Sequence, residues 1–189
     1  MTSLKPSQIA KLHDRLLFEE IHHLKSYFIR LFSDLANEIS LDYLQVLHPQ
    51  SQGIKISKGN ELQHCPYQVL DLIRDFDKHM GLNIRVMNWW GRGLFIFVFL
   101  GGNHAKANPQ GAFVSTLSSL GYSLTKTASP WDYTRIIDLD QKEKIFGVET
   151  LNIHLSRFHY MQFVKHLEYE HDLQAQKETL KQQLTYLLK

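Results

Sequence analysis

The sequence predicts an α+β domain, with a central and mainly antiparallel sheet of about five strands packed by long N- and C-terminal helices. Apolar side chains recur with a helical period toward both ends of the chain, which predicts the helices. Leu94–Leu100 is an uninterrupted apolar run rich in β-branched and aromatic residues, typical of a central strand covered on both faces. With 189 residues, 43% of them hydrophobic, the chain can form one domain over residues 1–189.

The N-terminal segment, residues 1–48, is expected to be helical. Pro6 fits the first position of a helix, where its missing N–H costs no hydrogen bond. From Ser7 to Asn37 such a helix would be ~45 Å long, more than a compact domain of this size needs. Its apolar stripe must therefore pack on another long helix or on a second copy of the chain. The stripe consists of Leu17, Ile21, Leu24, Phe28, Leu31 and Leu35.

The sheet core is expected within residues 54–140. Ile54–Ser57 alternates apolar and polar side chains, which indicates a short strand, and Lys58–Asn60 is its expected turn. The apolar residues of Pro66–Met80 fit a helix and a strand about equally well.

A β-hairpin is predicted in the middle of this core. Residues 84–89 alternate, Trp90–Gly93 supplies a glycine-containing turn, and the run Leu94–Leu100 follows at once. Two strands joined by so short a connection pair antiparallel.

The second half of the chain is expected to begin with a short helix over Gly111–Leu120, closed by Gly121. Strands are predicted at Ser123–Thr127 and Trp131–Asp140. From Ile153 onward the apolar spacing predicts a C-terminal helix over residues 153–189. The two long helices make a homodimer an attractive expectation, with surplus apolar surface buried between copies.

Charge and composition narrow the classes of partner. Lys and Arg number 21 against 19 Asp and Glu, and the excess lies in residues 49–109, with seven basic and four acidic groups. A nucleic-acid-binding face is usually more densely basic, so nucleic-acid binding is disfavoured. The longest apolar run has seven residues, whereas a membrane helix needs ~20. Without a signal-like N-terminus, and with Cys65 alone, the expected location is cytoplasmic.

A pattern over about residues 55–100 resembles a family of small bacterial proteins of unknown function. Its elements are Lys58-Gly59, the run from Pro66 to Arg74 with Leu70-Asp71, and Trp89-Trp90-Gly91 before an apolar strand. The resemblance implies an extended segment at Tyr67–Phe76, because the family has a proline where this chain has Ile73. It implies no activity. Further departures from the family pattern are Glu61, Leu62 and His64.

A polar cluster around the two tryptophans is the most concrete candidate site. If the strands from Ile54 to Leu100 are neighbours, cations beside aromatic planes could hold a small anionic ligand, with Arg74 as a bidentate donor. The alternative is a structural ion pair between Asp71 and Arg74, with the tryptophans packed into the core. The candidate ligand-binding residues are Lys58, Asp71, Arg74, Trp89, Trp90 and Arg92.

Metal ligation must be weighed because the chain contains 11 histidines. Glu-x-x-His occurs at Glu19/His22, at Glu20/His23 and at Glu168/His171, the spacing that places two ligands on one helix face in di-iron bundles. Glu19 and His22 fall on the side opposite the apolar stripe, and a bundle site needs two further inward glutamates. We therefore expect no metal, with Glu20, His23, Glu168 and His171 as the only weak candidates.

No nucleotide-binding, hydrolase or zinc motif is present, and Cys65 fits a buried filler better than a nucleophile. The sequence favours a non-enzymatic cytoplasmic protein that binds a partner or a small anion, without a cofactor. One alternative is a metal-dependent enzyme built on the Glu-x-x-His helices. Another is binding of single-stranded RNA by Trp89, Trp90 and the basic middle segment.

Overall fold

The computed structural model describes residues 3–137, 142–144 and 147–189. In this part of the chain helices pack against an open antiparallel sheet of seven strands, so the predicted α+β class is confirmed and five strands were too few. The strands are β1 (Lys55–Leu62), β2 (Cys65–Arg74), β3 (Leu82–Trp89), β4 (Gly93–Gly101), β5 (Ser123–Thr125), β6 (Lys142–Glu143) and β7 (Tyr160–Leu167). The helices are α1 (Pro6–His13), α2 (Arg15–Asn37), α3 (Leu41–Leu47), the 3-10 turn η1 (Ala105–Ala107), α4 (Ala112–Ser119), α5 (Tyr133–Ile136), α6 (Val148–Phe158) and α7 (Leu173–Leu187).

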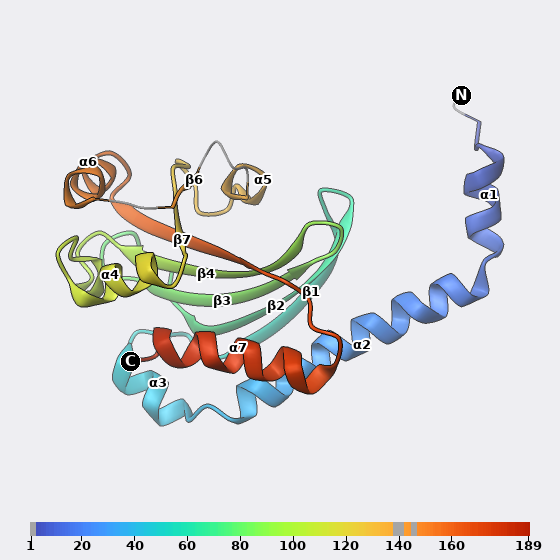
Figure 1. Ribbon diagram of the computed structural model, residues 1–189, viewed down its shortest axis with the longest axis horizontal. Helices are drawn as coiled ribbons and strands as arrows, with labels where there is room; N and C mark the ends of the chain where they lie inside the picture. Colours follow the sequence, from blue (N-terminus) through green and yellow to red (C-terminus); the bar gives the residue numbers. More distant parts are fainter. Residues whose placement is uncertain (1–2, 138–141, 145–146) are drawn as a thin grey trace.

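The strands lie in the order β1-β2-β3-β4-β7-β5-β6 (Figure 1). The predicted hairpin is confirmed, since β3 and β4 pair antiparallel from Leu82–Leu100 to Trp89–Gly93. Every residue of β4 is buried. This strand lies between β3 and β7 and has helices above and below it, as expected for an apolar run.

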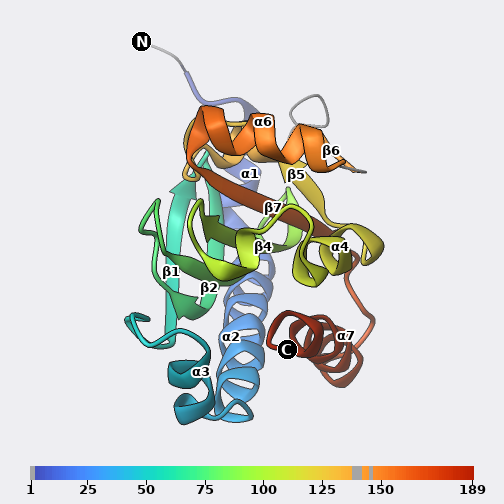
Figure 2. The same cartoon turned by 90° about the vertical axis from the view of Figure 1, so that its left-hand side faces the viewer.

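Each face of the sheet carries its own apolar cluster. The first, which we call the α2 face, packs against α2, α4 and α7 and contains most of the core. The second, the α5 face, packs against Ile136 and Tyr133 of α5. Figure 2 shows α2 and α7 on one side of the sheet and α6 on the other. The sheet residues of the apolar cluster on the α5 face are Val69, Met87, Trp89, Phe95, Phe97 and Val164.

The N-terminal segment forms α1, α2 and α3 instead of one unbroken helix from Ser7 to Asn37. Asp14 ends α1 with non-helical backbone angles, and its Oδ1 accepts a hydrogen bond from the Leu17 amide at 3.0 Å. An Asp side chain caps a helix in this way because it satisfies one of the unpaired amides of the first turn. The periodicity ran through Asp14 and concealed the break.

The first strand is longer than expected. β1 continues through Lys58–Asn60, the predicted turn, and reverses at Gln63 and His64, both of which have positive φ. Two consecutive left-handed residues match the twist of a two-residue hairpin. The ambiguous segment that follows is strand β2, as the resemblance implied.

Two predictions in the second half of the chain are wrong. Residues 131–137 form a turn and α5 instead of a strand, because the Asp132 side chain caps the Arg135 amide; residues 138–140 lie outside the described ranges. The C-terminal segment is not one helix, since β7 separates α6 from α7. In Tyr160–Leu167 the spacing of the apolar side chains fits both a helix and a strand. The segment forms a strand because it pairs with β4 along its whole length.

The sheet core extends beyond its predicted limit at residue 140, because β6 and β7 belong to it. The helix over Gly111–Leu120 is confirmed as α4, and the strand at Ser123–Thr127 is confirmed in shorter form as β5. None of the described helices is long and apolar enough to cross a membrane.

Candidate interaction site at Trp90 and the N-terminal arm

The six predicted ligand-binding residues are divided between the two faces of the sheet. Lys58 is opposite Gln68, which in turn is opposite Asn88, and this row lies on the α2 face. Asp71 is opposite Arg85 on the α5 face. Cross-strand partners share a face and successive residues alternate. The structure therefore does not bring Lys58 and Asp71 together.

The charged partner of Asp71 is Arg85 and not Arg74. Arg85 donates from Nε to Oδ1 at 2.7 Å and from Nη2 to Oδ2 at 3.0 Å, and Asn83 Nδ2 donates to Oδ1 at 3.0 Å. The Arg85 guanidinium also donates to the Tyr133 hydroxyl. It lies 5.2 Å from the ring centre of Phe76. With its acceptors occupied and 2% of its surface exposed, Asp71 serves packing and not a ligand.

Arg74 is engaged at the end of β2. Its Nη2 donates to the Gln52 carbonyl at 2.8 Å, and its amide donates to Ser51 Oγ at 3.1 Å. The Arg74 Nε is buried and has no hydrogen-bond partner. The Arg74 guanidinium connects the segment before β1 to β2. Its Nη2 is already hydrogen-bonded and its Nε is buried, so these donors are not available for the bidentate binding of an anion that the sequence predicts.

Trp89 and Trp90 point to opposite faces, because they are consecutive at the end of a strand. Trp89 is fully buried on the α5 face, and its Nε1 donates to the Leu62 carbonyl at 3.0 Å. The exposed Arg92 places its guanidinium 5.6 Å from the Trp89 ring centre. Trp89 therefore has no free ring face for a base, which removes half of the aromatic platform that RNA binding required.

Trp90 lies on the α2 face and joins a polar network. Its Nε1 donates to Gln68 Oε1 at 2.9 Å, and the same oxygen accepts from Asn88 Nδ2 at 2.8 Å. The Tyr169 hydroxyl donates to Asn88 Oδ1 at 2.7 Å. Burial raises the pKa of Tyr169 to about 12. This network holds the Trp90 ring beside α2. It could not be predicted from the sequence, because Gln68, Asn88 and Tyr169 are far apart in the chain.

A small apolar cleft of about 200 Å³ lies between this network and α2. Trp90 and Tyr169 form one side, and Leu24 and Phe28 of α2 form the other. Leu24 is 46% exposed whereas Phe28 is buried. The cleft therefore marks the place where the stripe of α2 leaves the core and becomes uncovered.

The part of the chain before this cleft, residues 6–24, forms an arm that extends away from the sheet (Figure 1). α1 contains no buried residue, and the buried residues of α2 begin at Phe28. Beyond the sheet the arm exposes apolar side chains that a surface helix normally avoids. The exposed large apolar side chains in and next to the arm are Leu4, Ile9, Leu12, Leu16, Phe18 and Leu24.

The two halves of the arm differ in the sign of their net charge. The first half holds Lys11 and Arg15 with Asp14 between them, a net +1, while the second half holds Glu19 and Glu20, a net −2. All five side chains belong to exposed residues, and Arg15 and Glu19 form a 3.4 Å ion pair on the helix surface. Two such arms placed antiparallel would set the basic half of each beside the acidic half of the other.

The weak metal candidates are separated. Glu20 and His23 are exposed on α2, while Glu168 and His171 are exposed in the connection between β7 and α7 and not on the helix that was expected there. Among residues 3–137, 142–144 and 147–189 no three His, Cys, Asp or Glu side chains are grouped as metal ligands.

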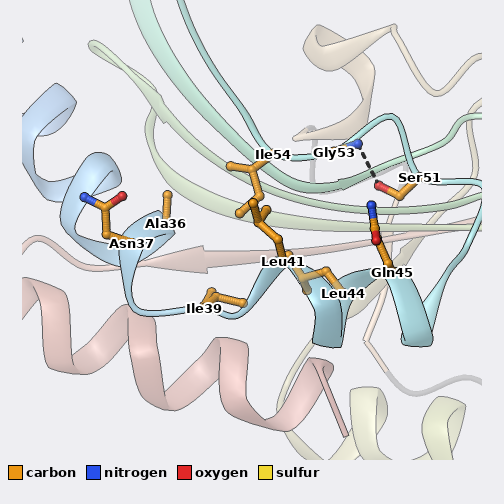
Figure 3. A pocket seen from close by; sticks show the side chains of 9 residues that line it. All are labelled: Ala36, Asn37, Ile39, Leu41, Leu44, Gln45, Ser51, Gly53 and Ile54. Atoms are coloured by element: carbon orange, nitrogen blue, oxygen red, sulfur yellow. Dashed lines mark hydrogen bonds between the residues drawn. The ribbon is translucent and has the colours of Figure 1, made fainter.

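A cavity of about 570 Å³ lies between α2, α3 and the segment that leads to β1 (Figure 3). Its walls are mainly apolar, with Ile39, Leu44 and Ile54 among them. The Ser51 hydroxyl at its edge already accepts hydrogen bonds from the amides of Gly53 and Arg74. No titratable side chain lines this cavity in the described part of the chain, so we assign no chemistry to it.

No protein-family model, curated protein or solved structure matches this chain.

Proposed function

We propose that this chain is a non-enzymatic binding protein that acts as a homodimer, joined by antiparallel pairing of its arms. The observation that carries the proposal is the exposed apolar surface of the arm, at Leu12, Leu16, Phe18 and Leu24, which reaches the cleft beside Trp90. The partner is a second copy because the arm is complementary in charge to itself when reversed. A two-fold interface requires this self-complementarity.

Pairing would stabilise the helices of the arm by burying their apolar side chains. α1 has eight residues and no buried side chain. Isolated helices shorter than ~12–15 residues are marginal in water, and most helix stability comes from burial of an apolar face. Covering the exposed leucines of the arm supplies that burial at about 25 cal/mol per Å² of apolar surface.

The small anionic ligand expected at the tryptophans has less support than a protein partner. Asp71 and Arg74 are both engaged within the chain, and Trp89 is buried. Lys58 and Trp90 remain on the α2 face, and Lys58 is exposed. They would border the dimer interface in this proposal.

The experiment compares two acidic substitutions by light scattering of the purified full chain. Wild type at micromolar concentration should have twice the 22.1 kDa mass of the chain. L12E/L16E, at positions that are 64% and 66% exposed, should be monomeric with an unchanged sheet signal in circular dichroism. The matched control is V46E on α3, 81% exposed, which should stay dimeric. A monomeric wild type, or a dimeric L12E/L16E variant, would overturn the proposal.

A further inference from the structure

A second cavity, which we call the α6 pocket, lies between α6 and the end of β5 and has a volume of about 220 Å³. Leu124 and Lys126 form one wall, and α6 side chains from Thr150 to Phe158 form the other. A water molecule takes up about 30 Å³ in the liquid, so the space is sufficient for a ligand of roughly seven to ten non-hydrogen atoms. None of its residues belongs to the arm or to the Trp90 cleft.

The α6 pocket carries an excess of positive charge. Lys126 forms a 3.0 Å ion pair with Glu143, which neutralises it in part. The Arg157 guanidinium lies 5.0 Å from the Phe158 ring centre, and no carboxylate of a described residue is within ion-pair distance of it. A guanidinium held against an aromatic ring with its N–H groups free is well suited to a planar anion.

The interior of the pocket offers an unused polar atom beside apolar walls. His154 is 5% exposed, and its Nε2 is buried without a hydrogen-bond partner. The His154 ring lies 4.7 Å from the Phe158 ring, centre to centre.

We infer that the α6 pocket binds a small carboxylate with an apolar body, whose carboxylate pairs with Arg157 and Lys126 while its body contacts Phe158, Ile153 and Leu124. A carboxylate fits these groups better than a neutral ligand, because Arg157 has two parallel donors for it. It fits better than a phosphate ester, because Leu124, Ile153 and Phe158 give the pocket an apolar wall for the body of the ligand. The polar groups of the lining are on four side chains, those of Lys126, Thr150, His154 and Arg157.

The test uses benzoate as the probe and its neutral analogue benzamide as the ligand control, with binding followed by NMR of the full chain. Benzoate should bind at least tenfold more tightly than benzamide and shift the His154 ring signals. R157Q should weaken benzoate binding at least tenfold, whereas R135Q, at an exposed arginine of α5, should leave it unchanged. Oligomeric mass should be the same with and without R157Q, which separates this inference from the proposed dimer.

A titration of the His154 ring provides the second measurement. Burial is the largest cause that lowers the pKa of His154; Lys126 and Arg157 also disfavour the imidazolium, whereas the backbone hydrogen bond with Tyr160 and the charge of Glu143 favour it. A bound carboxylate adds a negative charge beside the ring, so benzoate should raise the pH midpoint of His154. Equal affinity for benzoate and benzamide, no response of the His154 signals, or full binding by R157Q would each overturn the inference.

Discussion

Asp71 of β2 and Arg85 of β3 are cross-strand partners joined by two parallel hydrogen bonds of 2.7 and 3.0 Å on the α5 face. Trp131, Phe76 and Tyr133 surround the guanidinium, with ring centres 5.2 to 6.0 Å away. The pair therefore fixes the register of β2 on β3 and holds the segment containing α5 against the sheet. The Asp71–Arg85 pair is a structural centre, and the cleft beside Trp90 lies on the opposite face of the sheet.

Removing Asp71 alone should destabilise the fold strongly. D71A leaves the Arg85 charge largely buried without a counter-charge, which typically costs about 3–5 kcal/mol. The double variant D71L/R85M should lose less than the sum of the two single variants, since replacing both charges leaves neither unpaired. The cycle is measured by urea unfolding of wild type, D71L, R85M and D71L/R85M. If the losses of the two single variants add up to the loss of the double variant, the prediction is contradicted.

The hydrogen-bond network at Trp90 should depend on Gln68 Oε1 for its contribution to stability. Q68A removes the acceptor shared by Trp90 Nε1 and Asn88 Nδ2, and it should lower the free energy of unfolding by about 1–3 kcal/mol. The control is Q52A, because the structure uses the backbone of this exposed glutamine and not its side chain. Equal stability of Q68A and Q52A in chemical denaturation would show that the network is dispensable.

His154 should make the fold sensitive to acid. Burial, with a smaller contribution from nearby cations, lowers its pKa to about 4 from an ordinary 6.5, although a backbone hydrogen bond with Tyr160 opposes the shift. Between these values the unfolded chain binds a proton that the folded chain does not, so stability falls as the pH drops from 6.5 toward 4.

H154F should abolish this part of the pH dependence. Relative to wild type, the variant should keep about 2–3 kcal/mol more of its pH 7.5 stability when the pH is lowered to 4.5. The measurement is denaturant unfolding at both pH values, in which the contributions of the carboxylates common to both proteins cancel. The same pH slope in both proteins would be incompatible with a neutral buried His154.

The elements that sequence predicted well are those in which one local pattern dominates. Leu94–Leu100 has no competing helical period, and the glycines beside Arg92 supply the turn before it. Gly91 has φ +71°, a conformation that glycine adopts without strain. β7 was missed because the apolar side chains of Tyr160–Leu167 satisfy two periods, and only pairing with β4 decides between them.

The candidate site was harder to predict because it depends on register. A bulge at Leu72 places both Leu72 and Ile73 in the α2-face core and sets Asp71 opposite Arg85, whereas spacing along the chain suggested Arg74. Gly59, which follows Lys58 in the pattern of the family resemblance, packs against Tyr67. A side chain has no room at this position, because a Cβ would lie 2.5 Å from the Tyr67 ring. Such relationships follow from strand pairing, which the sequence alone does not specify.

Antiparallel pairing of two arms can be tested by exchanging their charges. K11E/R15E makes the arm acidic throughout, and E19K/E20K makes it predominantly basic. Each variant alone should repel itself and sediment near 22.1 kDa at low salt, while an equimolar mixture should sediment near twice that mass. A mixture that remains monomeric, or two variants that each dimerise as wild type does, would contradict pairing through the arm.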